Sequence, residues 1–221
     1  MRRSLLPTEP RAILFSLRGT LPVLDLDGER IVDSTRIVQS LERRDPQPAL
    51  YPDDPDERQR ALELEDFFDE HAGHDLRRVA FYDLRDDPDY VSAFLTTGRS
   101  AATRRIFRVL LAAPGSMAHA NRRYRLNAED AAASRITLAA ALDRVTDELQ
   151  PSGYLVGERF TVADLTAAAL LFPLAWPAEL QYDYPDPPDS PSMKSFEAHP
   201  ALDWIRDIYR RHRGASAETA R

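Results

Sequence analysis

The spacing of hydrophobic and polar residues predicts a short β-hairpin near the start of the chain. Residues 12–33 are expected to hold two short strands, because apolar side chains dominate the stretch from Leu21 to Leu26 and return at Ile31 and Val32. The pair Asp27-Gly28 lies between the two runs, and Asp-Gly in this position is a strong hairpin signal. The chain therefore begins with β-structure.

Helical spacing follows the hairpin and soon stops at a proline-rich segment. Ser34 is the expected N-cap of a helix that ends near Arg43-Arg44. The eleven residues from Asp45 to Pro55 then contain four prolines, which exclude a helix interior and indicate a linker. The apolar face of this helix is Ile37, Val38 and Leu41.

The rest of the chain predicts helices separated by breaks. The first runs from about Asp56 into the eighties, the second covers roughly 89–112, the third begins after Asn127, and the last spans about Pro200 to Arg213. The irregular segment 177–198, rich in proline, has the character of a lid or binding loop. The residues expected to face inward in the first of these helices are Leu62, Leu64, Phe67 and Phe68. The apolar residues along the helices that follow are Phe94, Ile106, Val109, Leu110, Leu138, Leu142, Val145, Leu149, Leu202, Ile205 and Tyr209.

A capping box marks the start of the remaining helix. Thr161 and Asp164 have the spacing at which each side chain reaches the other's backbone N–H, with Phe160 and Leu165 at the flanking hydrophobic positions. The stretch that follows, Thr166 to Phe172, is apolar on nearly every side, so this helix is expected at the centre of the helical domain.

These elements predict a division of the chain by residue number. An α/β domain takes residues 1–45, a proline-rich linker 46–55, an all-helical domain 56–214 and a disordered tail 215–221.

Composition narrows the function classes. The net charge of −7 argues against nucleic acid as a partner. The absence of cysteine excludes disulfides, thiolate nucleophiles and Cys-x-x-Cys redox chemistry. The longest mostly apolar stretch, Leu165 to Trp176, is too short to span a membrane, so we expect a cytoplasmic protein with no membrane partner. Lys194 is the only lysine.

Other groups of chemically active residues are weaker signals. His71 and His74 can share a helix face, but no third ligand is evident, so no metal site is predicted. The arginine pairs are interpreted as solvated helix faces with acidic neighbours. Aromatic residues that could line an apolar substrate pocket are Phe81, Tyr82, Tyr124, Trp176, Tyr182 and Tyr184.

Three stretches together resemble the glutathione transferase superfamily. They are Gly19-Thr20-Leu21-Pro22-Val23-Leu24, Val32-Asp33-Ser34-Thr35-Arg36-Ile37, and Ser152 to Leu165. The resemblance covers about residues 12–213. It implies a partial thioredoxin-like α/β domain followed by an all-helical bundle.

The resemblance also implies a ligand and a site. The proline matching Pro22 is cis in the family, so that the backbone of Leu21 pairs with glutathione like an added strand. Ser34 would hold the γ-glutamyl carboxylate at a helix N-terminus, and Asp33 would lie near the peptide's amino group. Glutathione as co-substrate, a small hydrophobic electrophile as acceptor, and a homodimer are the implied partners.

The start of the chain departs from the family pattern. Only 21 residues precede Pro22, whereas a β-α-β unit needs about 30 or more. Either the natural chain begins further upstream or the first unit is missing, and no thiol-activating residue can be named. Ser4, Ser16 and Thr20 do not match the family pattern. A second hypothesis therefore stands beside the transferase: a non-catalytic module of the same fold that dimerises or binds a ligand.

Overall fold

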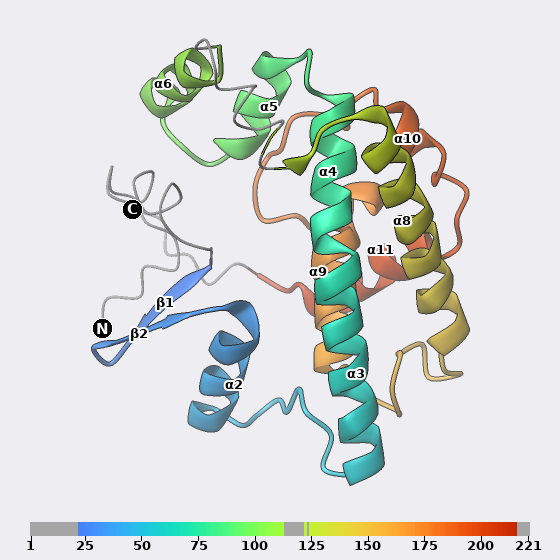
Figure 1. Cartoon of the computed structure of the whole chain (residues 1–221). Helices are drawn as coiled ribbons and strands as arrows, with labels where there is room; N and C mark the ends of the chain where they lie inside the picture. The colour runs from blue at the N-terminus through green and yellow to red at the C-terminus, as the bar shows by residue number, and fades with distance from the viewer. Residues whose placement is uncertain (1–21, 113–121, 123, 216–221) are drawn as a thin grey trace. The chain divides into compact units, whose positions relative to one another are not determined.

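The computed structural model divides the chain into two compact units, residues 1–50 and 51–221 (Figure 1). It describes residues 22–112, 122 and 124–215. The order of elements confirms the expected fold class, which is α/β structure followed by an all-helical region.

The first unit contains the predicted hairpin. Strand β1 (Val23–Leu26) pairs antiparallel with β2 (Glu29–Val32), with Leu24 opposite Ile31. The turn has positive φ at both central residues, 52° at Asp27 and 93° at Gly28, as a type I′ turn requires. Helix α2 (Ser34–Arg44) follows directly. Its Ile37 packs with Leu24 and Ile31, so the hairpin and helix share a small apolar core.

The first helix of the second unit is divided in two, where the sequence predicted one. Helix α3 (Pro55–His71) and helix α4 (Gly73–Asp83) are separated at Ala72. Asp54 caps α3 by accepting the backbone N–H groups of Asp56 and Glu57, both at 3.0 Å. The division coincides with a close approach: a Cβ at Gly73 would lie 3.1 Å from Leu170 Cδ2. A side chain at residue 73 would therefore require the Leu170 side chain on α9 to shift by a few tenths of an ångström.

The expected second helix is also divided. Helix α5 (Pro88–Leu95) and helix α6 (Ala101–Ala112) are separated by a turn in which Gly98 has φ of +73°. Helix α6 packs against α5. Its apolar residues Ile106, Val109 and Leu110 are 58%, 65% and 50% exposed. The prediction of one helix over 89–112 is wrong because it extended one helical period across the turn.

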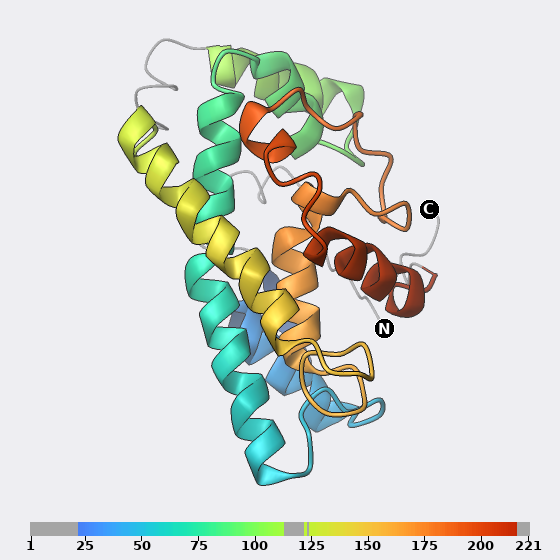
Figure 2. The same ribbon diagram turned by 90° about the vertical axis from the view of Figure 1, so that its right-hand side faces the viewer.

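Helix α9 (Val162–Ala175) is the centre of the helical unit, as predicted (Figure 2). It packs against α3 and against α11 (Ala201–His212), while α4 packs against α8 (Ala128–Glu148). Val162, Ala163, Ala167 and Leu171 are buried on α9. Of the positions predicted for α8, Leu138, Leu142 and Val145 are fully buried, whereas Leu149 is 40% exposed beyond the helix end.

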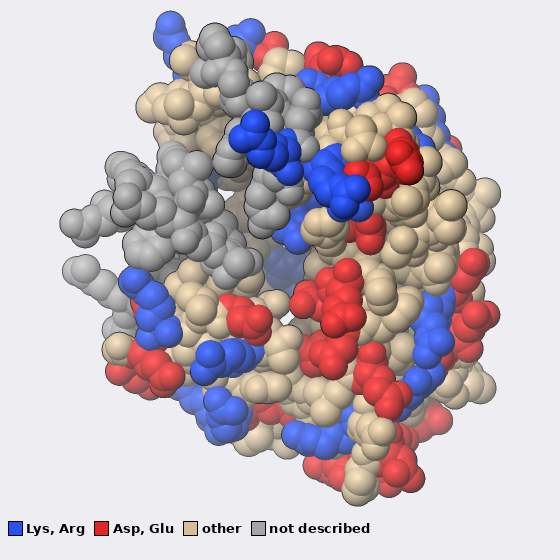
Figure 3. Space-filling model, viewed as in Figure 1, with Lys and Arg blue, Asp and Glu red and all other residues tan. Residues whose placement is uncertain are grey.

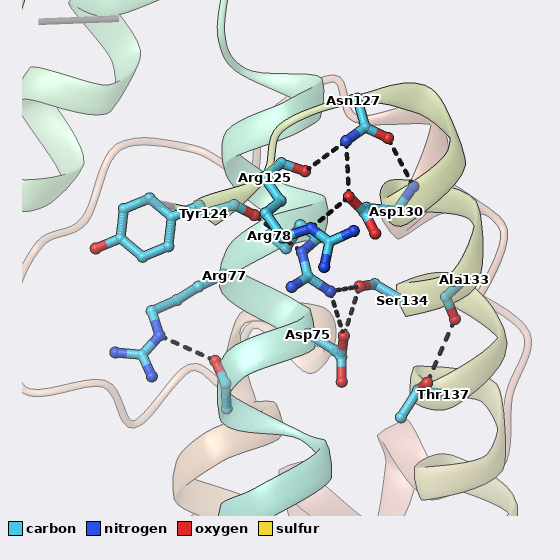
Figure 4. Close-up of polar contacts among 11 residues, drawn as sticks. Asp75, Arg77, Arg78, Tyr124, Arg125, Asn127, Asp130, Ala133, Ser134 and Thr137 are labelled. Carbon is cyan, nitrogen blue, oxygen red and sulfur yellow. Dashed lines mark hydrogen bonds and ion pairs between the residues drawn. The ribbon is translucent and has the colours of Figure 1, made fainter. Parts of the chain in front are cut away.

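A polar network joins α4 to α8 and to the segment that precedes α8 (Figure 4). The Arg78 guanidinium donates to the Tyr124 carbonyl at 2.9 Å and to Ser134 Oγ at 2.8 Å, and it forms an ion pair with Asp75 at 3.1 Å. Ser134 Oγ also donates to Asp75 Oδ1. The Asn127 side chain accepts the Asp130 N–H at 2.9 Å, which confirms the predicted cap of α8.

Of the segment 177–198 predicted to be irregular, residues 177–190 are irregular, whereas Pro191–Lys194 form the short helix α10. Lys194, at the end of α10, forms an ion pair with Asp189 at 2.6 Å. Most of the tail predicted for 215–221 lies outside the described residues. Among the helices that the structure describes, none combines the length and the apolar character that a bilayer crossing demands.

Candidate functional site

The N-terminus of α2 carries two of the predicted site residues, with the roles of cap and first helical residue exchanged. Ser34 was expected to cap the helix, but Asp33 is the N-cap: its Oδ1 accepts the Arg36 N–H at 3.1 Å and its carbonyl accepts the Ile37 N–H at 3.0 Å. Asp and Ser are equally good N-caps, so the sequence Asp33-Ser34 alone does not determine which residue caps the helix. Ser34 is the first residue of the helix, and its side chain is exposed.

The hairpin register brings Pro22 to this helix start. Because Val23 pairs with Val32, Pro22 and Asp33 are the next residues beyond the paired strand ends, at the same end of the hairpin. Pro22 is exposed there. Leu21, and with it the peptide bond predicted to be cis, lies outside the described residues. The register thus brings three of the four residues predicted to bind glutathione, Pro22, Asp33 and Ser34, close together in space.

Asp33 has a backbone conformation that non-glycine residues seldom adopt, with φ of 86° and ψ of 126°. Such strain often marks functional positions. Only Oδ1 of its carboxylate has a hydrogen bond among the described residues, so Oδ2 is open to an ammonium group. The exposed Ser34 hydroxyl and the positive end of the α2 dipole favour a carboxylate beside it. The site can therefore hold a ligand with one amino and one carboxylate group.

The helical unit gathers three of the predicted aromatic residues, Trp176, Tyr182 and Tyr184, together with Phe94 and Phe172. We name these five residues the aromatic cluster. The ring of Tyr184 lies 5.1 Å from Phe94, 6.2 Å from Phe172, 6.4 Å from Trp176 and 6.3 Å from Tyr182 between centroids. Side chains from α5, α9 and the segment 177–190 thus meet at one place. An apolar, aromatic surface of this kind suits an aromatic ligand.

The other predicted aromatic residues do not join the cluster. Phe81 and Tyr124 form a separate pair with centroids 5.0 Å apart, and Tyr82 lies under the Arg85 guanidinium at 4.4 Å. The sequence placed Phe94 in the second predicted helix and gave no site role to Phe94 or Phe172. Phe94 and Phe172 belong to the cluster because of where α5 and α9 lie in the fold, and no local sequence pattern predicts those positions.

Three tyrosines at or near the aromatic cluster have raised pKa values. Burial raises the pKa of Tyr90 to about 12, with smaller contributions from Asp186 and Asp87. Burial also raises the pKa of Tyr209 to about 12 and raises the pKa of Tyr184. The Tyr90 hydroxyl oxygen is buried and has no hydrogen-bond partner among the described residues. All three phenols are therefore neutral at physiological pH and cannot act as anionic bases there.

Charged residues elsewhere do not assemble a second site. No group of three or more His, Asp or Glu side chains able to hold a metal ion occurs in the described part of the chain. Basic and acidic side chains alternate over the face seen in Figure 3. Arg108 pairs with Asp89, Arg125 with Asp130 and Arg206 with Asp203, as expected of solvated helix faces.

Comparison with protein families gives the class of the helical unit. Residues 107–209 match the family model "Glutathione S-transferase, C-terminal domain". The matched range runs from α6 into α11 and includes the capping box at Thr161. Residues 107–209 are thus similar to a glutathione S-transferase C-terminal domain, which confirms the resemblance to the glutathione transferase superfamily.

Three solved structures of low sequence identity are similar to the chain, and the first of them, with a TM-score above 0.5, shares its fold. The beta-etherase LigF from Sphingobium sp. strain SYK-6 is 20% identical, with a TM-score of 0.54 over 90% of this chain and 83% of its own. A glutathione S-transferase from Methylobacterium radiotolerans, solved with glutathione sulfonate, is 22% identical over 91% of this chain and 75% of its own, with a TM-score of 0.48. One from Rhodospirillum rubrum F11 is 19% identical over 89% and 74%, with a TM-score of 0.41. No curated protein matches the chain.

Proposed function

We propose that this chain is a cytoplasmic glutathione-dependent transferase that joins glutathione to a small hydrophobic electrophile. The observation that carries the proposal is the hairpin register, which sets Pro22 beside Asp33 and Ser34 at the start of α2. The similarity of residues 107–209 to a glutathione S-transferase C-terminal domain supports the same conclusion.

Each group of the peptide has a complementary partner in this proposal. The γ-glutamyl carboxylate accepts a hydrogen bond from the Ser34 hydroxyl and binds at the N-terminus of α2, and the amino group forms an ion pair with Asp33 Oδ2. The backbone at Leu21 and Pro22 pairs with the cysteinyl amide. The aromatic cluster holds the electrophile.

The chemical step is a substitution or an addition by sulfur. The glutathione thiol gives its proton to solvent, and the thiolate forms a bond to the electrophilic carbon. In a substitution the leaving group departs with its bonding pair; in an addition the π-bond pair moves to the neighbouring atom, which takes up a proton from solvent. Stabilisation of the thiolate is the main catalytic contribution. No residue is assigned to that contribution.

Calorimetric titration with glutathione tests the binding half of the proposal. Ser34→Ala removes a hydrogen bond to a charged group, a loss of about 1.5–3 kcal/mol, so we expect the Kd to rise about 10- to 100-fold. Ser40→Ala is the matched control, since Ser40 lies further along α2 and accepts from Arg43. Retention on glutathione-agarose should follow the same order. If the unmodified chain shows no affinity for glutathione, the binding assignment is wrong.

A conjugation assay with a halogenated dinitrobenzene tests the catalytic half. We expect product formation that depends on both glutathione and protein. Glutathione binding without turnover of any electrophile in a panel would favour the second hypothesis, a non-catalytic ligand-binding module.

We also propose that the chain forms a homodimer, as the superfamily resemblance implies. Light scattering on a size-exclusion column should then give twice the chain mass of 25.0 kDa. A mass of one chain at micromolar concentration would contradict this part of the proposal.

A further inference from the structure

The segment 177–190, here named the strap, carries two members of the aromatic cluster. It starts after Trp176, which ends α9 in the left-handed conformation with φ of 48°. Among the described residues, the hydrogen bonds that join two backbone groups of the strap are local, from Tyr184 N–H to the Tyr182 carbonyl and from Ser190 N–H to the Pro188 carbonyl. The side chains of the strap therefore contribute to its position.

One buried carboxylate fastens the far end of the strap. Asp83, the last residue of α4, accepts the Ser190 hydroxyl through Oδ2, and the same oxygen accepts the Ser192 N–H at 3.0 Å. The Asp83 side chain is 5% exposed, and Ser190 is completely buried. Arg135 of α8 completes the fastening: it lies 3.8 Å from Asp83 Oδ1 and donates to Ser192 Oγ at 2.6 Å.

The near part of the strap is seated by close contact. A Cβ added to Gly98, in the turn between α5 and α6, would lie 3.0 Å from the Tyr182 ring. Tyr184 contacts the rings of Phe94 on α5 and Phe172 on α9. The strap thus joins α5 and α9 only while both tyrosines remain in place.

We propose that Asp83 is a positioning residue: by fastening Ser190 and Ser192 it holds the strap, and the strap supplies Tyr182 and Tyr184 to the surface that selects an aromatic acceptor. This inference rests on the proposed function for its acceptor, but the fastening stands on the contacts above. In this proposal Asp83, a buried residue at the end of α4, acts on the acceptor through the strap. Its loss therefore weakens acceptor binding and leaves glutathione binding unchanged.

Limited proteolysis measures the fastening directly. Chymotrypsin can cut the strap after Leu180 or Tyr182, and the products are identified by mass spectrometry. Asp83→Ala removes hydrogen bonds to a buried charge, so we expect cleavage there to accelerate about tenfold or more. Ser190→Ala is the milder second variant and should give a smaller increase. Asp86→Ala, whose side chain is 86% exposed, is the matched control and should leave the rate unchanged.

Fluorescence and kinetics separate the two parts of the inference. Acrylamide quenching of Trp176 should increase in the Asp83 variant, since Tyr184 covers one side of the indole, while the buried Trp204 contributes little change. The KM for an aromatic electrophile should rise about tenfold with the glutathione KM unaltered.

Equal cleavage in the Asp83→Ala, Ser190→Ala and Asp86→Ala proteins would overturn the fastening. Faster cleavage with an unchanged acceptor KM would overturn the positioning role. If no variant and no parent protein conjugates any electrophile, the proposed function fails, and cleavage and quenching still decide the fastening.

Discussion

The carboxylate of Asp164 should be among the most costly single side chains to remove from the helical unit. It is completely buried at the first turn of α9. Its two oxygens accept three hydrogen bonds: the Leu155 N–H at 2.8 Å, the Thr161 N–H at 2.8 Å and the Thr161 hydroxyl at 2.9 Å. The side chain therefore joins the start of the central helix to the loop that precedes it.

The magnitude follows from the donors that Asp164→Ala leaves behind. The Thr161 hydroxyl can rotate to another acceptor, but two buried backbone N–H groups cannot. An unsatisfied buried donor costs about 1–3 kcal/mol, so the two together cost about 2–6 kcal/mol. We expect a loss of about 4 kcal/mol, a large share of the 5–15 kcal/mol typical of a folded domain. Asp164→Asn keeps one acceptor oxygen and should lose about half as much.

Urea denaturation followed by circular dichroism measures this loss. The matched control is Asp203→Ala, since Asp203 is also an acidic residue in a first helical turn, but its side chain is 87% exposed and pairs only with Arg206. The control should change the free energy of unfolding by less than about 0.5 kcal/mol. An Asp164→Ala loss below about 1 kcal/mol would refute the reasoning, because the two amides would then have found other partners.

The remaining predictions concern tyrosines. Because burial raises the pKa of Tyr90 and Tyr209 to about 12, their absorbance at 295 nm should change in a late step, after the exposed tyrosines have ionised near pH 10. Both pKa values lie above those of the unfolded chain, so the stability they contribute is present in full below about pH 10 and is lost as the pH rises through 12; an absorbance change complete by pH 11 would contradict this. Tyr90→Phe removes a buried hydroxyl that has no partner among the described residues, so the Tm should stay the same or rise, whereas Tyr154→Phe, which loses a 3.1 Å hydrogen bond to His212, should lower it. A Tyr90→Phe protein that melts earlier than Tyr154→Phe would show that the hydroxyl is satisfied in solution.

Local signals in the sequence predicted the parts of the fold that local interactions determine. The Asp27-Gly28 turn, the Asn127 cap and the start of α9 at Thr161 are each specified by neighbouring residues, and all three occur as predicted. The failures lie where tertiary packing decides. Helix α3 ends before Ala72 and helix α5 ends before Thr96, although hydrophobic periodicity alone would continue both.

The candidate site likewise contains some features that the sequence predicted and others that it did not. Pro22, Asp33 and Ser34 were found through family motifs, and the strand register brings them together. The exchange of cap between Ser34 and Asp33 could not be predicted, since both residues are good caps and the backbone conformation at Asp33 decides. No pattern in the sequence indicated a role for Asp83, because its partners Ser190 and Ser192 are more than 100 residues away in the chain.

The chain contains one lysine, Lys194, which lies at the end of α10. A lysine-specific endoprotease has a single cleavage site, after Lys194, and separates α11 and the residues beyond it from the rest. Because Lys194 closes a helix that is only one turn long, that peptide bond becomes a substrate when the turn unwinds. The digestion rate of the unmodified protein therefore records, without any label or engineered residue, how often this corner of the molecule opens.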